Sequence, residues 1–315
     1  MSQVSWIEVT EEESGQRLDN FLLKHLRKVP KTLIYRVIRK GEVRVNKGRA
    51  QPSQRVLTGD VVRVPPIMVP EVGDTVKPPR AQMDKIAELV LYEDADLIII
   101  NKPSGIAVHG GSGVSWGLIE LIRELRPDAR RVELVHRLDR DTSGAIILAK
   151  KTSVLRALHE QVRDNKVEKH YLTLLSGQWP KGKEKVDFPL LKNTLQSGER
   201  MVQVSDEGKP CLSYFMLQKQ FKNAALMKVR LITGRTHQIR VHAQAMGCPV
   251  IGDEKYGDEA ANKYFKQLGM RRLALHAQFL QFIHPVTEQV VQVEAPLFND
   301  FEQIIKLLNE QGLGS

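Results

Sequence analysis

The stretch of this 315-residue chain with the most reactive side chains is Val135–Gly144, which reads Val-His-Arg-Leu-Asp-Arg-Asp-Thr-Ser-Gly. Two short apolar runs rich in branched residues flank it and are expected to be buried strands, so the stretch is expected to be a loop at the end of a sheet. Charged groups beside a core must be paired to be tolerated. We interpret the loop as a candidate active site centred on Asp139. The alternative is a polar turn in which Asp141 and Thr142 hydrogen-bond their own backbone.

A second polar stretch, Thr233–His242, also follows an expected strand. Thr236 is expected to cap a helix that begins there. Arg235 is the natural partner for a carboxylate at the end of a neighbouring strand, since a guanidinium favours the ionised form of a carboxylate. His237 and His242 are five residues apart, which on a helix separates them by about 140°. This spacing argues against a metal site built from the two histidines.

The positive charge of the chain is concentrated in one short segment. The net charge is +10, and residues 17–64 hold thirteen Lys or Arg against three acids, so the rest of the chain is balanced. A local basic block on an otherwise neutral protein is typical of binding to a polyanion. The segment lacks the broad apolar face of a membrane-surface helix, and the apolar runs of the chain are far too short to span a bilayer.

The two cysteines, Cys211 and Cys248, form neither a disulfide framework nor a zinc-binding pattern. Isolated thiols fit a reducing cytosol, and the acidic N-terminal residues do not resemble a signal peptide, so we expect a cytoplasmic protein. The glycine-rich stretch 110–113 matches neither a phosphate-binding nor a dinucleotide-binding fingerprint. We expect no cofactor and no metal.

The pattern of the chain predicts two domains. Residues 1–65 are expected to form a small module with helices over 17–26 and 30–41. The proline-rich residues 66–80 are expected to be a linker, and residues 81–315 a catalytic domain. Its expected strands are 89–92, 97–101, 131–135, 145–149, 171–175, 226–232, 277–283 and 290–294, and its expected helices are 115–125, 152–164, 236–246 and one near the C-terminal end.

The N-terminal module resembles the alpha-L RNA-binding motif known from a small-subunit ribosomal protein. The resemblance rests on Arg17-Leu18-Asp19 at the start of the first expected helix and on Gly41–Asn46 after the second. It implies binding to structured RNA, mainly through phosphates. The cations of the second helix and the following strand are the expected RNA-binding residues: Lys31, Arg36, Arg39, Lys40, Arg44, Lys47 and Arg49.

Four motifs of the larger domain together resemble the RluA-type pseudouridine synthases. They are Leu97–Gly105, His136–Gly144, Lys169–Leu172 and Thr233–Arg240, in this order and spacing. The resemblance implies an α+β pseudouridine synthase fold with a central mixed, mainly antiparallel sheet. It also implies the isomerisation of uridine to pseudouridine in ribosomal RNA of the large subunit or its precursor, without a cofactor.

The same resemblance assigns roles to residues. Asp139 matches the catalytic carboxylate, Arg235 its arginine partner, and Tyr171 the tyrosine that stacks on the uracil. Arg137 is expected to help hold the RNA open while the target base leaves its stack, which costs a few kcal/mol. The further residues expected to bind the substrate are Leu231, His109 and Arg240.

Three interpretations of function remain open at this point. The first is a monomeric pseudouridine synthase, for which the acylal, Michael-type and glycal routes all use the same aspartate. The second is a non-catalytic RNA-binding factor in ribosome assembly that keeps the fold. The third is a hydrolase of a small substrate with Asp139 as nucleophile. This third interpretation leaves the basic module unexplained.

Overall fold

The computed structural model describes residues 3–26, 29–67, 78–110, 116–129, 131–194 and 200–310. The chain divides into two compact units, 1–77 and 78–315, which are treated separately below. Most of the expected linker, residues 68–77, lies outside the described residues. Its expected end differs from the structure: Arg80 already begins helix α3 (Arg80–Ala87), because the preceding proline is compatible with a helix start.

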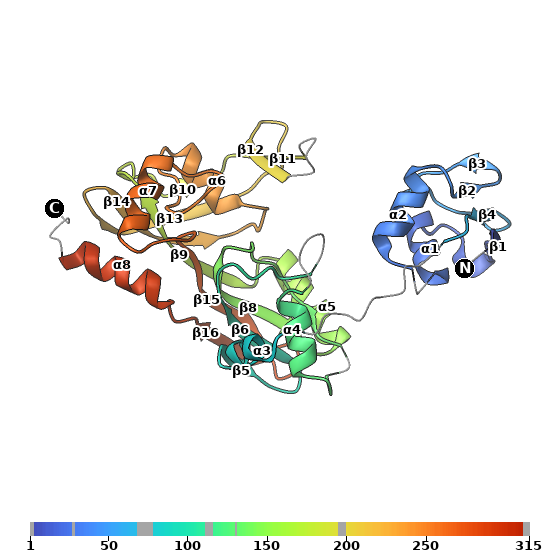
Figure 1. Ribbon diagram of the computed structural model, residues 1–315, viewed down its shortest axis with the longest axis horizontal. Helices are drawn as coiled ribbons and strands as arrows, with labels where there is room; N and C mark the ends of the chain where they lie inside the picture. The colour runs from blue at the N-terminus through green and yellow to red at the C-terminus, as the bar shows by residue number, and fades with distance from the viewer. Residues whose placement is uncertain are drawn as a thin grey trace. The chain divides into compact units, whose positions relative to one another are not determined.

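The N-terminal unit packs two helices against one face of a four-stranded sheet (Figure 1). Apolar residues of α1 and α2, such as Phe21 and Ile38, share one core with the inward side chains of the strands, such as Val62. Asn46 and Lys47 both have positive φ, which makes the tight turn between β2 and β3. The sheet order is β1-β4-β2-β3, and the elements are β1 (Ser5–Glu8), η1 (Glu11–Glu13), α1 (Leu18–His25), α2 (Lys31–Arg39), β2 (Arg44–Val45), β3 (Gly48–Arg49) and β4 (Val61–Val64).

The larger unit is built on a ten-stranded sheet, counted over the described residues. Its order is β10-β13-β14-β9-β15-β8-β6-β5, with β16 paired to β15 and β7 to β8. The β15–β8 pair is parallel and the other pairs are antiparallel, which confirms the predicted α+β fold with a mixed, mainly antiparallel sheet. The strands are β5 (Val90–Glu93), β6 (Leu97–Lys102), β7 (Glu133–Leu134), β8 (Ser143–Ala149), β9 (Glu168–Ser176), β10 (Lys185–Val186), β13 (Ser213–Gln220), β14 (Ala224–Leu231), β15 (Leu275–Ile283) and β16 (Val290–Glu294), with β11 (Leu190–Thr194) and β12 (Arg200–Val204) forming a separate hairpin.

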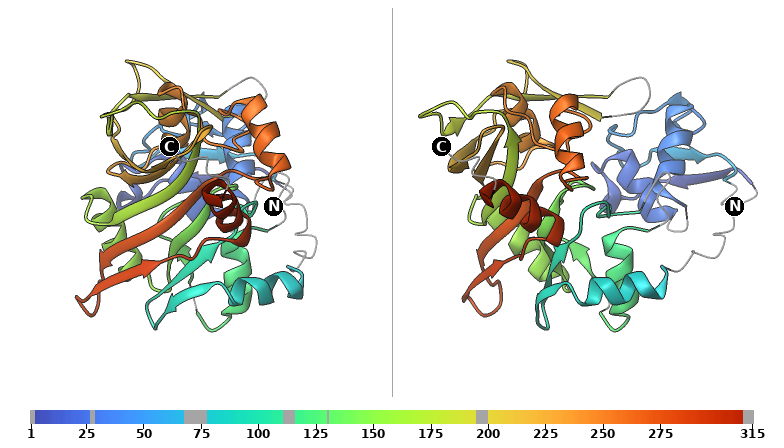
Figure 2. Two further views of the ribbon diagram at one scale, coloured as in Figure 1. Left: turned by 90° about the vertical axis from the view of Figure 1, so that its left-hand side faces the viewer. Right: turned by 60° about the vertical axis from the view of Figure 1, so that its left-hand side comes forward.

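Strands β6 and β8 have a core on each side, because successive side chains of a strand point to opposite faces. Ile98 and Ile100 pack with helix residues on one face, and Leu97 and Ile99 pack with α5 on the other. This double burial explains why both strands read as continuous apolar runs. The helices lie around the sheet as Figure 2 shows: α4 (Leu118–Leu125), α5 (Thr152–Arg163), α6 (Gln238–Ala245), α7 (Glu259–Gln267) and α8 (Asn299–Glu310).

Three boundaries differ from the sequence-based expectation. The strand expected over 131–135 is only Glu133–Leu134, and α4 begins at Leu118, after residues 111–115, which lie outside the described residues. The helix expected from Thr236 begins at Gln238, because His237 has φ 54° in the left-handed region and cannot continue a helix. Over the described residues, no helix has the length and apolar character needed to cross a membrane.

Candidate active site

Asp139 lies in the loop that joins β7 to β8, and the turn after β6 holds this loop in place. Lys102, which is completely buried, donates from Nζ to the Pro103, Ile106 and Arg140 carbonyls at 2.9–3.0 Å. The Gly105 N–H also donates to the Arg140 carbonyl, at 2.9 Å. One buried ammonium therefore joins the two loops beside Asp139.

The environment of Lys102 acts on its charge in two directions. Burial lowers the pKa of the Lys102 ammonium to about 7, although the negative charges of Asp141 and Asp139 act to raise it. The three carbonyl acceptors use all three protons of an ammonium group and so favour the charged form. The turn after β6 thus places a positive group beneath the acidic loop.

Gly144 allows the loop to pass directly into β8. It has φ +111°, and a Cβ atom at this position would lie 2.3 Å from the Ala277 carbonyl oxygen and 2.5 Å from the Ala277 nitrogen. Such distances exclude any side chain, because the backbone of β15 lies beside it in the one parallel pairing found among the described strands. The glycine that closes the Val135–Gly144 stretch therefore lets the loop enter β8 in close contact with the backbone of β15.

A buried guanidinium connects two carboxylates at the centre of the site. Arg240, in the first turn of α6, donates from Nε and Nη2 to the two oxygens of Asp253 at 2.7 and 2.8 Å. Its Nη1 donates to Oδ2 of Asp139 at 3.2 Å. The Arg240 guanidinium thus binds both oxygens of Asp253 and one oxygen of Asp139, which fixes the position of the Asp139 carboxylate.

The charges of this triad are complementary. Burial acts to lower the pKa of the Arg240 guanidinium, but its hydrogen bond to Asp253 and the charges of Asp253 and Asp139 raise that pKa above its usual range. Burial likewise acts to raise the pKa of Asp253, and Arg240 together with the Lys255 and Tyr256 backbone N–H groups lowers it. Both groups therefore stay ionised although Asp253 is 1% exposed.

The expected arginine partner of Asp139 is corrected by these contacts. Arg235 lies exposed in the turn before α6, and its guanidinium makes no ion pair with any described residue. Arg240 is 8% exposed and binds Asp139 instead. The sequence places both arginines after the same strand, and Arg240 turns inward because it lies in the first turn of α6 and binds Asp253.

His237 also approaches Asp139, and Tyr256 hydrogen-bonds the other side of the His237 ring. The Tyr256 hydroxyl accepts from the Val202 backbone N–H at 3.1 Å and hydrogen-bonds Nδ1 of His237 at 2.8 Å. Nε2 of the same ring lies 3.8 Å from Oδ1 of Asp139. Burial lowers the pKa of His237, against the charge of Asp139, so the ring is neutral at neutral pH. His242 bonds elsewhere, to Ser213 and the Phe188 carbonyl, so the two histidines share no site.

Tyr171, on β9, lies beside Asp139 on the wall of the same pocket. It is 8% exposed, and burial followed by the charge of Asp139 raises the pKa of its phenol above the usual range. The phenol is therefore neutral at neutral pH. A buried neutral ring beside the carboxylate gives a flat apolar surface for a planar base.

Asp139 lies where a small pocket opens into a large cleft. The pocket has a volume of about 80 Å³ and includes Tyr171, Leu231 and Arg235. The cleft has a volume of about 1070 Å³ and includes His109. Arg137, Asp139 and Arg240 line both. The structure therefore brings all the expected catalytic and substrate-binding residues of this unit to one continuous cavity, while changing the arginine that pairs with Asp139.

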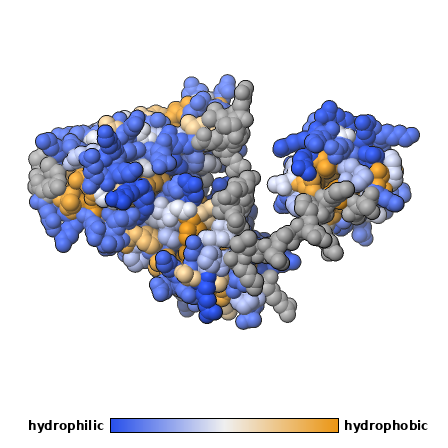
Figure 3. All heavy atoms as spheres, in the orientation of Figure 1, coloured by the Kyte–Doolittle hydropathy of each residue, from blue (hydrophilic) through white to orange (hydrophobic). Residues whose placement is uncertain are grey.

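The expected RNA-binding residues lie on the surface of the N-terminal unit. All seven are exposed, on α2, on the residue that ends it, and on the β2–β3 hairpin. Of the seven, only Lys40 approaches a carboxylate among the described residues, Glu42 at 3.8 Å. Figure 3 shows hydrophilic residues over most of the visible face of this unit.

Lys102, Asp253, His237 and Tyr256 complete the site; of these, sequence reasoning considered only His237, as a metal ligand, and assigned none of the four to the site. For Asp253 a signal was present: it follows the apolar pair Val250–Ile251 and a glycine, so it is another acid at the end of a buried segment. The other three lack such a signal, because a lysine, a histidine or a tyrosine near an expected strand has many ordinary explanations.

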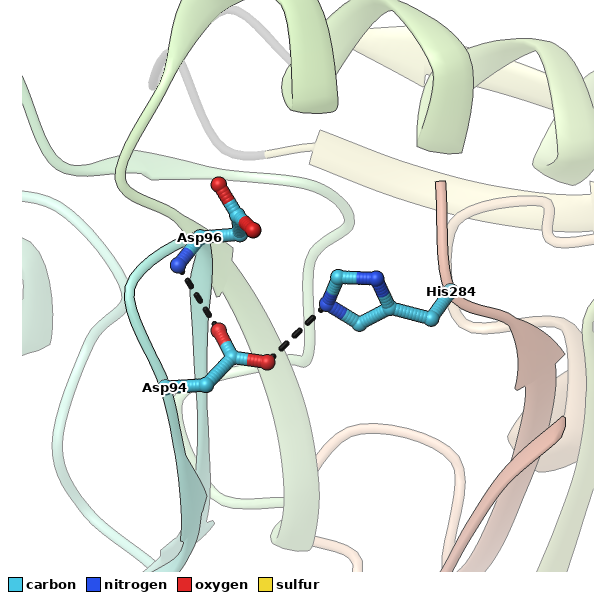
Figure 4. A group of neighbouring side chains, drawn as sticks. All are labelled: Asp94, Asp96 and His284. Carbon is cyan, nitrogen blue, oxygen red and sulfur yellow. Dashed lines mark hydrogen bonds and ion pairs between the residues drawn. The ribbon is translucent and has the colours of Figure 1, made fainter. Parts of the chain in front are cut away.

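One further group of acidic and histidine side chains in the described part of the chain is close enough to hold a metal: Asp94, Asp96 and His284 (Figure 4). Two backbone N–H groups donate to Nδ1 of His284 at 3.1 and 3.2 Å, so its proton is on Nε2, which donates to Asp94 at 2.9 Å. Asp94 also accepts two backbone N–H groups, and Lys151 lies 2.6 Å from Asp96. These hydrogen bonds and the ion pair engage all three side chains, so we interpret the group as a structural network between two hairpins.

Comparisons with known proteins identify the family of the chain and of its N-terminal unit. Residues 96–245 match the family described as RNA pseudouridylate synthase, and residues 16–62 match the S4 domain. The chain is 51% identical to the ribosomal large subunit pseudouridine synthase C of Pasteurella multocida, over 98% of this chain and 95% of that protein. It is 49% identical to the protein of the same name from Escherichia coli K12, over 97% of each.

The solved structures give the same picture. The structure of human RNA pseudouridylate synthase domain containing 4 has a TM-score of 0.60 and 26% identity, covering 73% of this chain and 96% of that one. Human RNA pseudouridylate synthase domain containing 1, at 23% identity and a TM-score of 0.54, shares the fold.

Proposed function

Because the chain belongs to the RNA pseudouridylate synthase family, and so is an RNA pseudouridine synthase, we propose that it isomerises specific uridines of large-subunit ribosomal RNA or its precursor. The relatives that it matches over nearly their full length are named as synthases of the large ribosomal subunit, which supports this substrate. The observation that carries the proposal is Asp139, which Arg240 holds by one oxygen at the point where the pocket meets the cleft.

The reaction leaves the composition of the nucleotide unchanged, although one hydrogen is exchanged with water. The N1–C1′ bond breaks, the uracil rotates, a C5–C1′ bond forms, and the proton lost from C5 is balanced by one gained at N1. Asp139 is the carboxylate that attacks, or stabilises positive charge, during this exchange. Arg240 keeps it in place, and Tyr171 stacks on the detached uracil so that the base stays in the pocket while it turns.

The cleft and the N-terminal unit bind the RNA. Exposed Arg137 and Arg235 lie at the pocket, where they bind the RNA that flanks the flipped base. His109 and Leu231 line the walls around the nucleotide. The exposed cations of the N-terminal unit, Lys31, Arg36, Arg39, Lys40, Arg44, Lys47 and Arg49, bind phosphates of a structured region.

We further propose that one chain acts alone in the cytoplasm and needs no cofactor. In support, Asp139, Arg240, Asp253 and Tyr171 all come from the same chain, so the site needs no residue of a second copy. The reaction is redox-neutral and releases only a proton that water replaces, which requires no electron or group carrier.

Tritium release tests the proposal. The full chain is incubated with a large-subunit ribosomal RNA transcript that carries tritium at C5 of uridine, and tritium in water is counted. Asp139→Ala is expected to lower the rate by roughly 10⁴-fold or more, because Asp139 is the one carboxylate among the described residues that line the small pocket. Asp164→Ala, at an exposed acid in the same unit, is the matched control and should retain full activity. Full activity of Asp139→Ala would refute the assignment and favour a non-catalytic assembly factor.

A further inference from the structure

Four residues form a straight row across the sheet of the N-terminal unit. Trp6 of β1 is directly opposite Arg63 of β4, Arg63 is opposite Arg44 of β2, and Arg44 is opposite Arg49 of β3. Residues directly opposite one another in a sheet project from the same face. One face of the sheet therefore carries an indole and three guanidiniums side by side, and we name this set the sheet-face row.

The sheet-face row is on the face away from the core. The neighbouring residues along the strands, including Val45, Val62 and Val64, are buried against the helices, so the row must point to the other side. Trp6 is 58% exposed, which is unusual for a side chain with so much apolar surface. Trp6 is not one of the residues that form the core of this unit, so packing does not explain its presence on the surface.

The three arginines are positioned but not neutralised. Each donates one hydrogen bond to a backbone carbonyl: Arg63 to Glu42 at 2.9 Å, Arg44 to Lys47 at 3.2 Å and Arg49 to Arg39 at 3.0 Å. Within the described residues no carboxylate forms an ion pair with any of them. A guanidinium has five N–H donors, so each of the three keeps donors for an outside acceptor.

We propose that this outer face of the N-terminal sheet binds an unpaired segment of the substrate RNA. A base stacks on Trp6, and Arg63, Arg44 and Arg49 bind the phosphates that follow. An exposed aromatic ring beside unneutralised guanidiniums is the combination that binds single-stranded nucleic acid without strong sequence preference. This inference rests on the proposed RNA substrate and adds Trp6 and Arg63 to the residues that contact it.

The row also determines the path of this RNA segment. Neighbouring strands lie about 4.8 Å apart, so the row runs roughly 14 Å across the strands from Trp6 to Arg49. Arg44 and Arg49 also belong to the basic surface of α2 and the β2–β3 hairpin, so the row continues that surface to the far edge of the sheet. A structured region on the helix side can therefore extend into a single strand on the sheet side.

Binding of an oligouridylate of about 12 nucleotides to the full chain tests the stacking contact. Trp6→Ala is expected to weaken binding by about 5- to 100-fold, while Trp6→Phe keeps most of the affinity. Leu57→Ala is the matched control, because Leu57 is 60% exposed in the same unit and is not in the row. A 5-iodouridine oligonucleotide should crosslink to Trp6, which mass spectrometry of the peptides would identify.

Arg63→Gln tests the phosphate contact and does not depend on the indole. It should reduce the steepness of the dependence of log affinity on log salt by about 0.7, the value for one contact on a single strand. If Trp6→Ala and Arg63→Gln both bind RNA as the wild type does, the inference is overturned. The face would then be free to bind another partner, such as an acidic protein. The proposed function is tested separately, because tritium release by the wild type does not depend on the result for these two variants.

Discussion

Arginine serves two opposite purposes in the two units of this chain. In the larger unit Arg240 is buried and spends three donors on the carboxylates of Asp253 and Asp139. In the N-terminal unit Arg44, Arg49 and Arg63 each spend one donor on a backbone carbonyl. The first arrangement fixes the position of a reactive group, and the second keeps positive charge available for an external anion. The number of internal partners therefore separates an arginine that positions a carboxylate from arginines whose donors stay available.

Replacing arginine by lysine in each unit gives the largest expected difference. Arg240→Lys should lower the rate of tritium release by roughly 10²- to 10³-fold, because an ammonium cannot hold Asp253 by two parallel bonds and still reach Asp139. Arg44→Lys should change the rate less than about twofold, since a point charge still attracts phosphate. Equal losses in both variants would show that the two arginines do not differ in kind.

Charge reversal in the N-terminal unit should affect binding and leave the chemical step unchanged. Arg36→Glu combined with Lys40→Glu is expected to raise KM for ribosomal RNA by about 10-fold, because two phosphate contacts become repulsive. The kcat value should remain that of the wild type, because these exposed residues belong to the other unit. Steady-state kinetics at two salt concentrations would measure both, and a loss confined to kcat would contradict the assignment of this unit to RNA binding.

The smallest expected effect is on the pH dependence of the unfolding free energy, through the buried residue His276 of the larger unit. His276 is fully buried, and burial lowers its pKa from 6.5 to about 4. Between these pH values the unfolded chain binds a proton that the folded chain does not, so stability falls as the pH falls. The expected slope is about 1.4 kcal/mol of unfolding free energy per pH unit. Urea unfolding through this range measures it, and His276→Asn should lack this part of the slope.

The elements that could be predicted from sequence were those with a strong apolar pattern. The runs 97–101 and 145–149 are strands β6 and β8, and the uneven distribution of charge predicted a separate basic module that matches the S4 domain. These features follow from local periodicity and composition, which a single sequence contains.

The arginine that pairs with Asp139 could not be predicted in the same way. Arg235 and Arg240 lie five residues apart after one strand, and the sequence gives both a reason to face the loop. The decision depends on the left-handed backbone at His237 and on Asp253, which binds Arg240 from a different part of the chain. Contacts between distant segments, rather than local pattern, determine this part of the site.

Arg240 binds Asp253 by two hydrogen bonds and Asp139 by one, and this difference affects the Asp139 carboxylate. Because Nε and Nη2 of Arg240 are engaged by Asp253, only Nη1 reaches Asp139. Among the described residues Oδ1 of Asp139 accepts no hydrogen bond, and its approach to His237 is 3.8 Å. A carboxylate bound through both oxygens would have fewer acceptor sites left for a ligand. Because Asp253 takes two of the donors of Arg240, one oxygen of Asp139 keeps its acceptor sites available at the pocket.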